Sequence, residues 1–299
     1  MEQPLGVVAT VETAEAPYAS SDHRISVWNG YQLAVTKWRP QSSPKVLLCI
    51  SHGVGEHMGR YDKLGKYLAE KGVLVYGHDH VGHGNSQGDR VYVNSFNTYV
   101  QDTVRHIEDM NKQHPEVPSM LLGHSMGGLV ATLVVEQNQS LVSALLLSSP
   151  GLDTDPAFGS FTYTVLQMVI AVIKRVLPQK ELLTLDPNFI STIPEEVQMY
   201  VEDPLVWHGG MKAGWIYEFG LALTEARANI RSITLPLFLM HGDGDRLVPI
   251  SASEFIRANI GSQDKQYEVF ADNYHEILHD KDQDRAMQLI ADWILANSN

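Results

Sequence analysis

The sequence has a single cysteine, Cys49, among its 299 residues. That count excludes an internal disulfide framework and favours a reducing compartment. Cys49 lies within an apolar segment, where a packed thiol is the expected role. Positive charge is also scarce, because 22 lysines and arginines stand against 35 aspartates and glutamates, a formal net charge of -13. Nucleic-acid binding calls for a basic surface, so this balance argues against a nucleic-acid partner.

Long apolar segments are missing as well. No run reaches the ~18 or more apolar residues of a membrane-spanning helix. The first 20 residues lack the basic start and the apolar middle of a signal peptide. We expect residues 1–21 to form a mobile N-terminal tail. The sequence predicts a cytoplasmic protein whose contact with a membrane is peripheral, and it gives no information on oligomeric state.

The most informative stretch is Gly123-His124-Ser125-Met126-Gly127, which matches the pattern G-x-S-x-G. It follows a short apolar segment, 119–122, and precedes another, 128–136, that is compatible with a buried helix. In this pattern, the nucleophile elbow, a strand turns sharply into a helix and projects the serine hydroxyl above the sheet. A Cβ at either glycine would crowd the turn. We predict Ser125 as a nucleophile; the context disfavours the alternative, a glycine-rich turn with an idle serine.

Apolar segments of strand length alternate with helical segments along most of the chain. Continuous apolar runs such as Val46–Ser51 are typical of parallel strands buried on both faces. We predict an α/β fold, a mostly parallel central sheet with helices on both faces, built from residues 22–150 and 233–299. Asn29-Gly30 predicts a hairpin turn ahead of it. The expected strands are 24–28, 32–38, 46–51, 73–76, 119–122, 144–148, 235–241 and 266–270, and the expected helices are 61–70, 96–113, 128–136, 251–260 and 285–296.

The strand pattern stops over residues 151–232, which read as a helical cap or lid. An insertion at this place lies above the carboxyl ends of the strands, where open α/β sheets bind ligands. Residues 158–177 carry apolar side chains at helical spacing, and Leu166 and Ile170 widen that apolar stripe. The stripe fits either a core helix or a lid helix that faces an acyl tunnel or a membrane. Its place in an insertion favours the lid.

A nucleophilic serine needs a base to take its proton and an acid to orient that base. Asp245 follows the strand expected at 235–241 and is the predicted acid, with Asp243 as the competitor. His275 stands between the last strand and the last helix and is the predicted base. His279, four residues later, is the alternative.

Attack by such a serine forms a tetrahedral intermediate, whose oxyanion needs hydrogen-bond donors. The elbow predicts one donor, the backbone N–H of Met126, and a second in the loop after an early strand. That loop is His52-Gly53-Val54-Gly55, and the amide of Val54 is the expected donor.

A second histidine-rich stretch, with His78, Asp79, His80 and His83, invites comparison with a metal site. No further cysteine or histidine cluster completes a ligand set, so we expect a tight turn with local hydrogen bonds instead. The glycine-rich segments do not match a phosphate-binding loop. We predict neither a metal nor a cofactor.

Together these motifs resemble the monoacylglycerol lipases of the α/β-hydrolase superfamily, over about residues 22–297. The joint set of motifs is far more specific than the elbow alone. It consists of Ser51-His52-Gly53-Val54-Gly55-Glu56-His57, Gly59-Arg60-Tyr61, His78-Asp79-His80-Val81-Gly82-His83-Gly84, Gly123-His124-Ser125-Met126-Gly127-Gly128, Asp203-Pro204-Leu205, Asp245-Arg246 and Tyr274-His275.

The resemblance implies an α/β-hydrolase fold and hydrolysis of a monoacylglycerol to a fatty acid and glycerol. It also implies a cap with an apolar tunnel and peripheral contact with membranes. Contacts to the glycerol head carry over onto Glu56, Arg60, His124 and Tyr200. A diol head group at the end of an apolar channel calls for a few fixed hydrogen-bond partners of this kind.

The sequence departs from the family pattern at three places. Val54 stands where a small alanine is usual, which narrows the site. His279 lies one step away from the spacing expected of a second histidine after the base. Trp207 occupies the place of a cap cysteine. Two other functions are kept as alternatives: a lysophospholipase or general carboxylesterase on the same residues, and a non-catalytic lipid-binding module.

Overall fold

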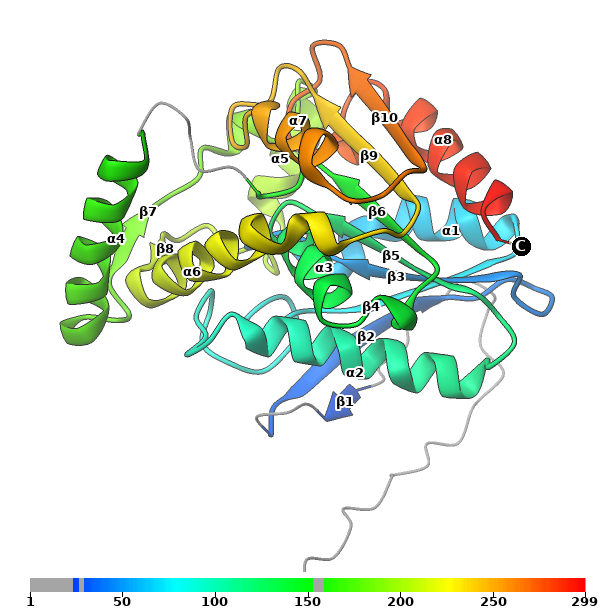
Figure 1. Ribbon diagram of the computed structural model, residues 1–299, viewed down its shortest axis with the longest axis horizontal. Helices are drawn as coiled ribbons and strands as arrows, with labels where there is room; N and C mark the ends of the chain where they lie inside the picture. The colour runs from blue at the N-terminus through cyan, green and yellow to red at the C-terminus, as the bar shows by residue number, and fades with distance from the viewer. Residues whose placement is uncertain (1–23, 27–29, 153–158, 299) are drawn as a thin grey trace, which may run out of the picture.

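An eight-stranded sheet forms the centre of the protein (Figure 1). The computed structural model describes residues 24–26, 30–152 and 159–298. The sheet order is β1-β2-β4-β3-β5-β6-β9-β10. The strands are β1 (Arg24–Ser26), β2 (Gln32–Trp38), β3 (Val46–Ser51), β4 (Val73–His78), β5 (Ser119–His124), β6 (Ala144–Ser148), β9 (Leu237–Gly242) and β10 (Lys265–Phe270).

Six of these strands are parallel, and the two N-terminal strands run antiparallel to their neighbours. β3 to β6, β9 and β10 pair in parallel. β2 pairs antiparallel with β4, and β1 with β2. The predicted fold class is therefore confirmed. Its consequence for function is geometric, because the loops that follow β3, β5, β9 and β10 all leave the same edge of the sheet.

Side-chain alternation divides the core into two layers. On β3, Leu47 and Cys49 point to one face, whereas Leu48 and Ile50 point to the other. The first face is covered by α2 (Asn97–Gln113), α3 (Met126–Gln137), α6 (Ala213–Asn229) and α7 (Ser251–Asn259). The second is covered by α1 (Asp62–Glu70) and α8 (Gln283–Ala296). Burial on both faces explains why β3, β4, β5, β6 and β9 are largely apolar.

Between β6 and β9 the chain leaves the sheet. It forms α4 (Gly159–Val176), β7 (Glu181–Leu183), α5 (Pro194–Glu202), β8 (Met211–Lys212) and then α6. In Figure 1, α4 lies away from the sheet, beside α6. This segment is anchored near the loop after β3, because Trp207 N–H donates to Gly55 O at 2.7 Å and His57 Nε2 lies 2.9 Å from Asp203 Oδ2.

One expectation needs correction. The segment predicted to be helical contains a two-stranded antiparallel sheet, β7 with β8. These strands have three and two residues, too short for an alternating pattern to show. The expected hairpin pairs Ser26 with Gln32 and has Gly30 at φ 77°. Asn29 lies outside the described residues, as do residues 1–21 and Phe158. Within the described ranges, no helix combines the length and apolarity needed to cross a membrane.

Candidate active site

Ser125 lies at the sharp turn from β5 into α3. Its backbone has φ 53° and ψ -119°, a conformation that non-glycine residues rarely adopt. The surroundings leave no room for larger neighbours: a Cβ on Gly123 would lie 2.3 Å from Gly127 O, and one on Gly127 would lie 1.9 Å from Ser51 O. The predicted elbow geometry is therefore present, and it turns the serine side chain toward the loop edge of the sheet.

His275 follows β10 and reaches Ser125 from another loop at the same edge of the sheet. Its Nε2 lies 2.9 Å from Ser125 Oγ, and its Nδ1 lies 2.6 Å from Asp245 Oδ2. Since the carboxylate accepts, Nδ1 carries the proton and Nε2 is left to accept from the serine hydroxyl. This is the arrangement in which a serine becomes a nucleophile.

Asp245 is held by more than one donor. Its Oδ1 accepts hydrogen bonds from the amides of Leu247, at 2.8 Å, and Val248, at 3.0 Å. Its Oδ2 lies 3.2 Å from His241 Nε2 in addition to its contact with His275. Burial alone would raise the pKa of Asp245, but the charge of His275 and the hydrogen bond from His241 outweigh it and hold the pKa well below the ordinary value. The carboxylate is thus ionised and fixed in place.

The two alternatives for these roles lie elsewhere. Asp243 is exposed and accepts a hydrogen bond of 2.6 Å from the amide of Asp272. His279 donates from Nε2 to the carbonyl of Arg60 at 2.8 Å. Neither residue has a hydrogen bond to Ser125 or His275 within the described part of the chain.

The electrostatic surroundings of His275 favour its charged form. Burial lowers its pKa, but the charge and hydrogen bond of Asp245, followed by the charges of Glu276 and Glu56, raise it above the ordinary value of 6.5. The neighbouring ring of His124, with its centroid 4.9 Å away, behaves oppositely. Burial and the charge of His275 lower the pKa of His124 to about 4, so this ring stays neutral near pH 7. Nδ1 of His124 donates to Ser148 O at 3.1 Å.

An apolar cavity of about 270 Å³ opens at these residues. Ser125 and His275 lie in its wall together with Val54 and Met126, the two residues whose amides were predicted to face an oxyanion. The remaining wall is apolar and comes largely from α6 and the β7–β8 region. It consists of Gly151, Leu183, Leu185, Met211, Trp215, Ile216, Phe219, Leu247, Val248 and Pro249.

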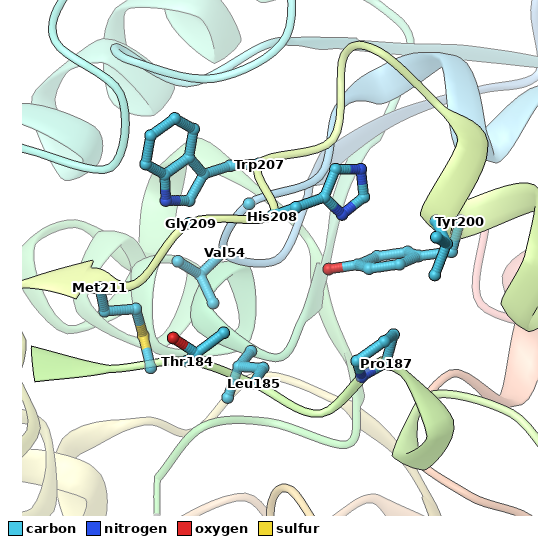
Figure 2. Close-up of a pocket in the computed structure, with 11 residues that line it drawn as sticks. Val54, Thr184, Leu185, Pro187, Tyr200, Trp207, His208, Gly209 and Met211 are labelled. Atoms are coloured by element: carbon cyan, nitrogen blue, oxygen red, sulfur yellow. The ribbon is translucent and has the colours of Figure 1, made fainter. Parts of the chain in front are cut away.

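A second cavity, of about 190 Å³, adjoins the first (Figure 2). The two share Val54, Leu185 and Met211 in their walls, so Val54 stands between them. Three polar side chains line the second cavity: Thr184, Tyr200 and His208. Figure 2 shows Thr184 beside Met211 and Leu185, and Tyr200 on the opposite side of the cavity. Trp207, the departure noted in the sequence, also lines this space.

The other predicted binding residues form a buried polar cluster beside Ser125. Glu56 Oε1 accepts from Gly53 N–H at 2.6 Å and from Tyr61 OH at 2.9 Å. Arg60 donates to Glu56 Oε2 at 3.2 Å, and its guanidinium lies 4.8 Å from the centre of the Tyr200 ring. The structure therefore brings the four predicted residues, His124 included, to the same side of the site.

The histidine-rich stretch after β4 is packed rather than open. His80 Nε2 lies 3.0 Å from Ser51 Oγ, His83 Nδ1 donates to Val81 O at 3.0 Å, and Asp79 accepts from the amide of Met58 at 2.8 Å. Over the ranges that the structure covers, no group of three or more His, Cys, Asp or Glu side chains could hold a metal ion. These side chains instead support the loop after β3.

Sequence reasoning missed three participants. His241 contacts the Asp245 carboxylate, Glu276 binds Arg60 through two hydrogen bonds of 2.6 Å, and α6 supplies the apolar wall through Trp215 and Phe219. Only adjacency offered a signal for Glu276, which follows the predicted base directly. The spacing of Trp215 and Phe219, four residues apart, places both on one helix face.

The fold and this site define an α/β-hydrolase with a serine, histidine and aspartate in hydrogen-bond contact. Comparison with known proteins agrees. Residues 42–282 match the family described as serine aminopeptidase, S33. The monoglyceride lipase of Rattus norvegicus is 35% identical over 88% of this chain and 85% of its own length. The chain belongs to the monoglyceride lipase family.

Two further relatives support this assignment. The monoacylglycerol lipase of Mycolicibacterium smegmatis is 30% identical over 93% of this chain and 98% of its own length. The crystal structure of a monoacylglycerol lipase from Paleococcus ferrophilus superposes with a TM-score of 0.76 at 28% identity, covering 89% of this chain and 99% of that one.

Proposed function

We propose that this protein hydrolyses monoacylglycerols to a free fatty acid and glycerol through an acyl-enzyme intermediate. The observation that carries the proposal is the hydrogen-bonded series Ser125–His275–Asp245 at the wall of an apolar cavity. The names of the relatives indicate the substrate class. A general carboxylesterase would use the same residues, and the experiment below separates the two.

In the first half-reaction, Ser125 Oγ attacks the ester carbonyl carbon while His275 Nε2 takes the serine proton. The tetrahedral intermediate then breaks its bond to the glycerol oxygen, which receives that proton from His275. Asp245 stabilises the imidazolium that forms in between. In the second half-reaction a water replaces glycerol and follows the same steps in the same roles, which releases the fatty acid and restores Ser125.

The oxyanion of the tetrahedral intermediate is assigned to two backbone amides. Met126 begins α3 directly after the nucleophile, where a helix N-terminus leaves amides without intrahelical partners. Val54 lies in the loop after β3 and lines the same cavity as Ser125. Donors fixed in advance at this point stabilise charge only as it develops in the transition state.

The two cavities suggest where the acyl chain and the glycerol of the substrate bind. The apolar wall of the 270 Å³ cavity suits an acyl chain. The cluster of Glu56, Arg60, His124 and Tyr200 forms the polar end of the site, on the glycerol side. Tyr200 lines the second cavity and is the residue of the four that is best placed for a direct hydrogen bond to a hydroxyl.

We further propose that residues 151–232 act as a cap over the site and meet a lipid surface through α4. Met168, Val172 and Val176 are more than 60% exposed, whereas Ile170 is 7% exposed and faces the protein. Leu177 and Leu183 continue the exposed apolar surface. A substrate that resides in a membrane would enter from such a surface. The single buried thiol, Cys49, favours action from the cytoplasmic side.

The test measures glycerol and fatty-acid release from 2-oleoylglycerol, with 1-oleoyl-lysophosphatidylcholine and a short nitrophenyl ester in parallel, for the wild type and Ser125→Ala. Strong turnover of the monoacylglycerol that the variant loses supports the proposal. Turnover of the nitrophenyl ester alone, or a preference for the lysophospholipid, would change the proposed substrate class and leave Ser125 as the proposed nucleophile. Full activity of Ser125→Ala would reject the mechanism.

A further inference from the structure

The residue that follows the base is a buried acid. Glu276 has only 5% of its surface exposed, and both carboxylate oxygens accept hydrogen bonds of 2.6 Å from the two terminal nitrogens of Arg60. Burial would raise the pKa of Glu276, but the charge of Arg60 and a hydrogen bond from His279 lower it well below its ordinary value. Glu276 is therefore an anion within one residue of His275.

Contacts within the protein occupy most of the Arg60 guanidinium. One edge of its guanidinium forms the two-pronged contact with Glu276, Nη1 also donates to Glu56, and the flat face lies over Tyr200. Its side chain is 8% exposed. A bidentate guanidinium–carboxylate pair fixes orientation as well as distance. Arg60 is thus a rigid connector between two carboxylates that are 220 positions apart in the chain.

The connection continues to the loop after β3. Glu56 Oε1 accepts from Gly53 N–H at 2.6 Å, and the same oxygen would lie 2.9 Å from a Cβ on Gly53. That Cβ position is 3.2 Å from Ser125 Cβ, so the Glu56 carboxylate stands close to the nucleophile. Gly53 precedes Val54 directly. A continuous chain of short contacts therefore joins the neighbour of the base to the neighbour of the assigned oxyanion donor.

We propose that Glu276 is a positioning residue which, through Arg60 and Glu56, holds the loop that carries His275 in register with the loop that carries the amide of Val54. This inference rests on the proposed function. The charge of Glu276 also has an electrostatic effect. The carboxylates of Glu276 and Glu56 and the guanidinium of Arg60 together leave one negative charge near the imidazolium that forms during the reaction.

The charged and titratable groups that face His275 determine the sign of that effect. They are Asp245, Glu276 and Glu56, which are anionic and favour the imidazolium, and His124, which is a neutral neighbour. Arg60 and His279 contact Glu276. Removing the charge of Glu276 makes His275 a weaker base, whereas removing the charge of Arg60 makes it a stronger one. The two changes move the acidic limb of the pH–rate profile in opposite directions.

The experiment compares Glu276→Gln, Glu276→Asp, Arg60→Met and the Glu276→Gln/Arg60→Met double variant. A soluble short-chain nitrophenyl ester is the substrate, and a fluorophosphonate titrates the functional sites so that misfolded enzyme does not enter kcat. Asp284→Asn is the matched control, because it removes a carboxylate that forms an exposed ion pair with Lys63 at 2.8 Å.

We expect Glu276→Gln to lower kcat per titrated site by about 10- to 100-fold with little change in KM, since a small misplacement of catalytic groups has effects of this size. Its acidic limb should move to lower pH and that of Arg60→Met to higher pH. The acidic limb of the double variant should return to its wild-type position, because the two charge changes cancel. Its kcat should stay low, because the contacts that join the two loops are lost. Glu276→Asp keeps the negative charge, so its acidic limb should lie at the wild-type position, whereas its kcat should be restored only in part.

Wild-type kcat per titrated site in Glu276→Gln, or shifts of the limb in the same direction for both single variants, would overturn the inference. Loss of titratable sites with an unchanged limb in the sites that remain would show a purely structural role and would also overturn it. Failure of the proposed function is seen separately, as full activity of Ser125→Ala in the same assay.

Discussion

Nε2 of His241 lies 3.2 Å from Oδ2 of Asp245, the same carboxylate oxygen that accepts the hydrogen bond from His275. His241 is itself fixed, because Nε2 contacts Val248 O at 2.9 Å and Nδ1 contacts Ser253 Oγ at 2.6 Å. The acid is therefore oriented by a side chain from the end of its own strand as well as by two backbone amides. This explains how the carboxylate can be fully buried and still keep one direction toward the base.

Replacing Asp245 by asparagine should reduce kcat by about 10⁴-fold without unfolding the protein, because the amide favours the wrong tautomer of the base and removes the anion that stabilises the imidazolium. Steady-state kinetics on a monoacylglycerol measure the change, and thermal unfolding checks the fold. Asp243→Asn is the control and should keep activity within a few-fold, since Asp243 is exposed. Equal losses in the two variants would contradict the assignment of the acid.

The rate should depend on pH through His275. Its pKa is raised above 6.5, chiefly by Asp245 against the effect of burial. The base works only in its neutral form, so kcat/KM should rise with pH and reach half its plateau above pH 6.5. A profile measured from about pH 5 to 9 on a non-ionising ester tests this. A midpoint below 6.5 would show that another group or another step controls the acidic limb.

Acid should destabilise the fold through the buried histidines near β3 and β4. Burial lowers the pKa of His78 and of His83 to about 4, from 6.5 in the unfolded chain. Groups with a lowered pKa contribute their stability above pH 6.5 and lose it as the pH falls toward 4, because the unfolded state binds more protons. The pKa values of His52, His80 and His106 are also lowered by burial.

Urea unfolding at a series of pH values measures this effect. The free energy of unfolding should fall by about 1.4 kcal/mol per pH unit for each histidine that titrates in the interval. His106→Gln should remove one such contribution and make the slope shallower. A slope that does not change in this variant would assign the acid sensitivity to other groups.

The exposed face of α4 should control access to lipid-borne substrate. Met168→Glu and Val172→Glu should each reduce vesicle binding, and hydrolysis of monooleoylglycerol held in vesicles, by about tenfold or more, because burial of such a side chain contributes about 1.5–3 kcal/mol. Hydrolysis of a soluble short-chain ester should not change. Gln263→Glu, on an exposed loop, carries the same charge change and controls for net charge. Equal losses on the two substrates would contradict a role in lipid contact.

A good part of the fold could be predicted because its signals are local. A strand buried on both faces is apolar at nearly every position, and β3 shows this in the five consecutive apolar residues 46–50. The elbow follows from backbone geometry at a strand end, and the chain order Ser125, Asp245, His275 is the one expected for this fold. The structure brings these three together through contacts of 2.6 and 2.9 Å.

Other features depend on contacts that no local pattern encodes. Glu276 and Arg60 are 216 positions apart, so neither residue indicates the other in the sequence. On α4 the apolar stripe is wide, and periodicity alone does not say which edge is covered. The structure buries Ile170 and exposes Leu166, although both belong to that stripe. β7 and β8 pair across 27 or more intervening residues with only a few positions each.

The adjacency of β6 and β9 has a consequence for engineering. These strands are neighbours in the sheet, with Leu145 beside Leu237 and Ser148 beside Met240. Because the two strands are parallel, the chain leaves at the carboxyl end of β6 and returns at the amino end of β9, at the opposite edge of the sheet. The segment between them must therefore travel back along the sheet, and α6 does so while it packs on the sheet through Trp215, Leu223 and Ala226. A graft that keeps α6 and exchanges only the part of the segment before it would replace the proposed lipid-facing surface while the strands keep their register.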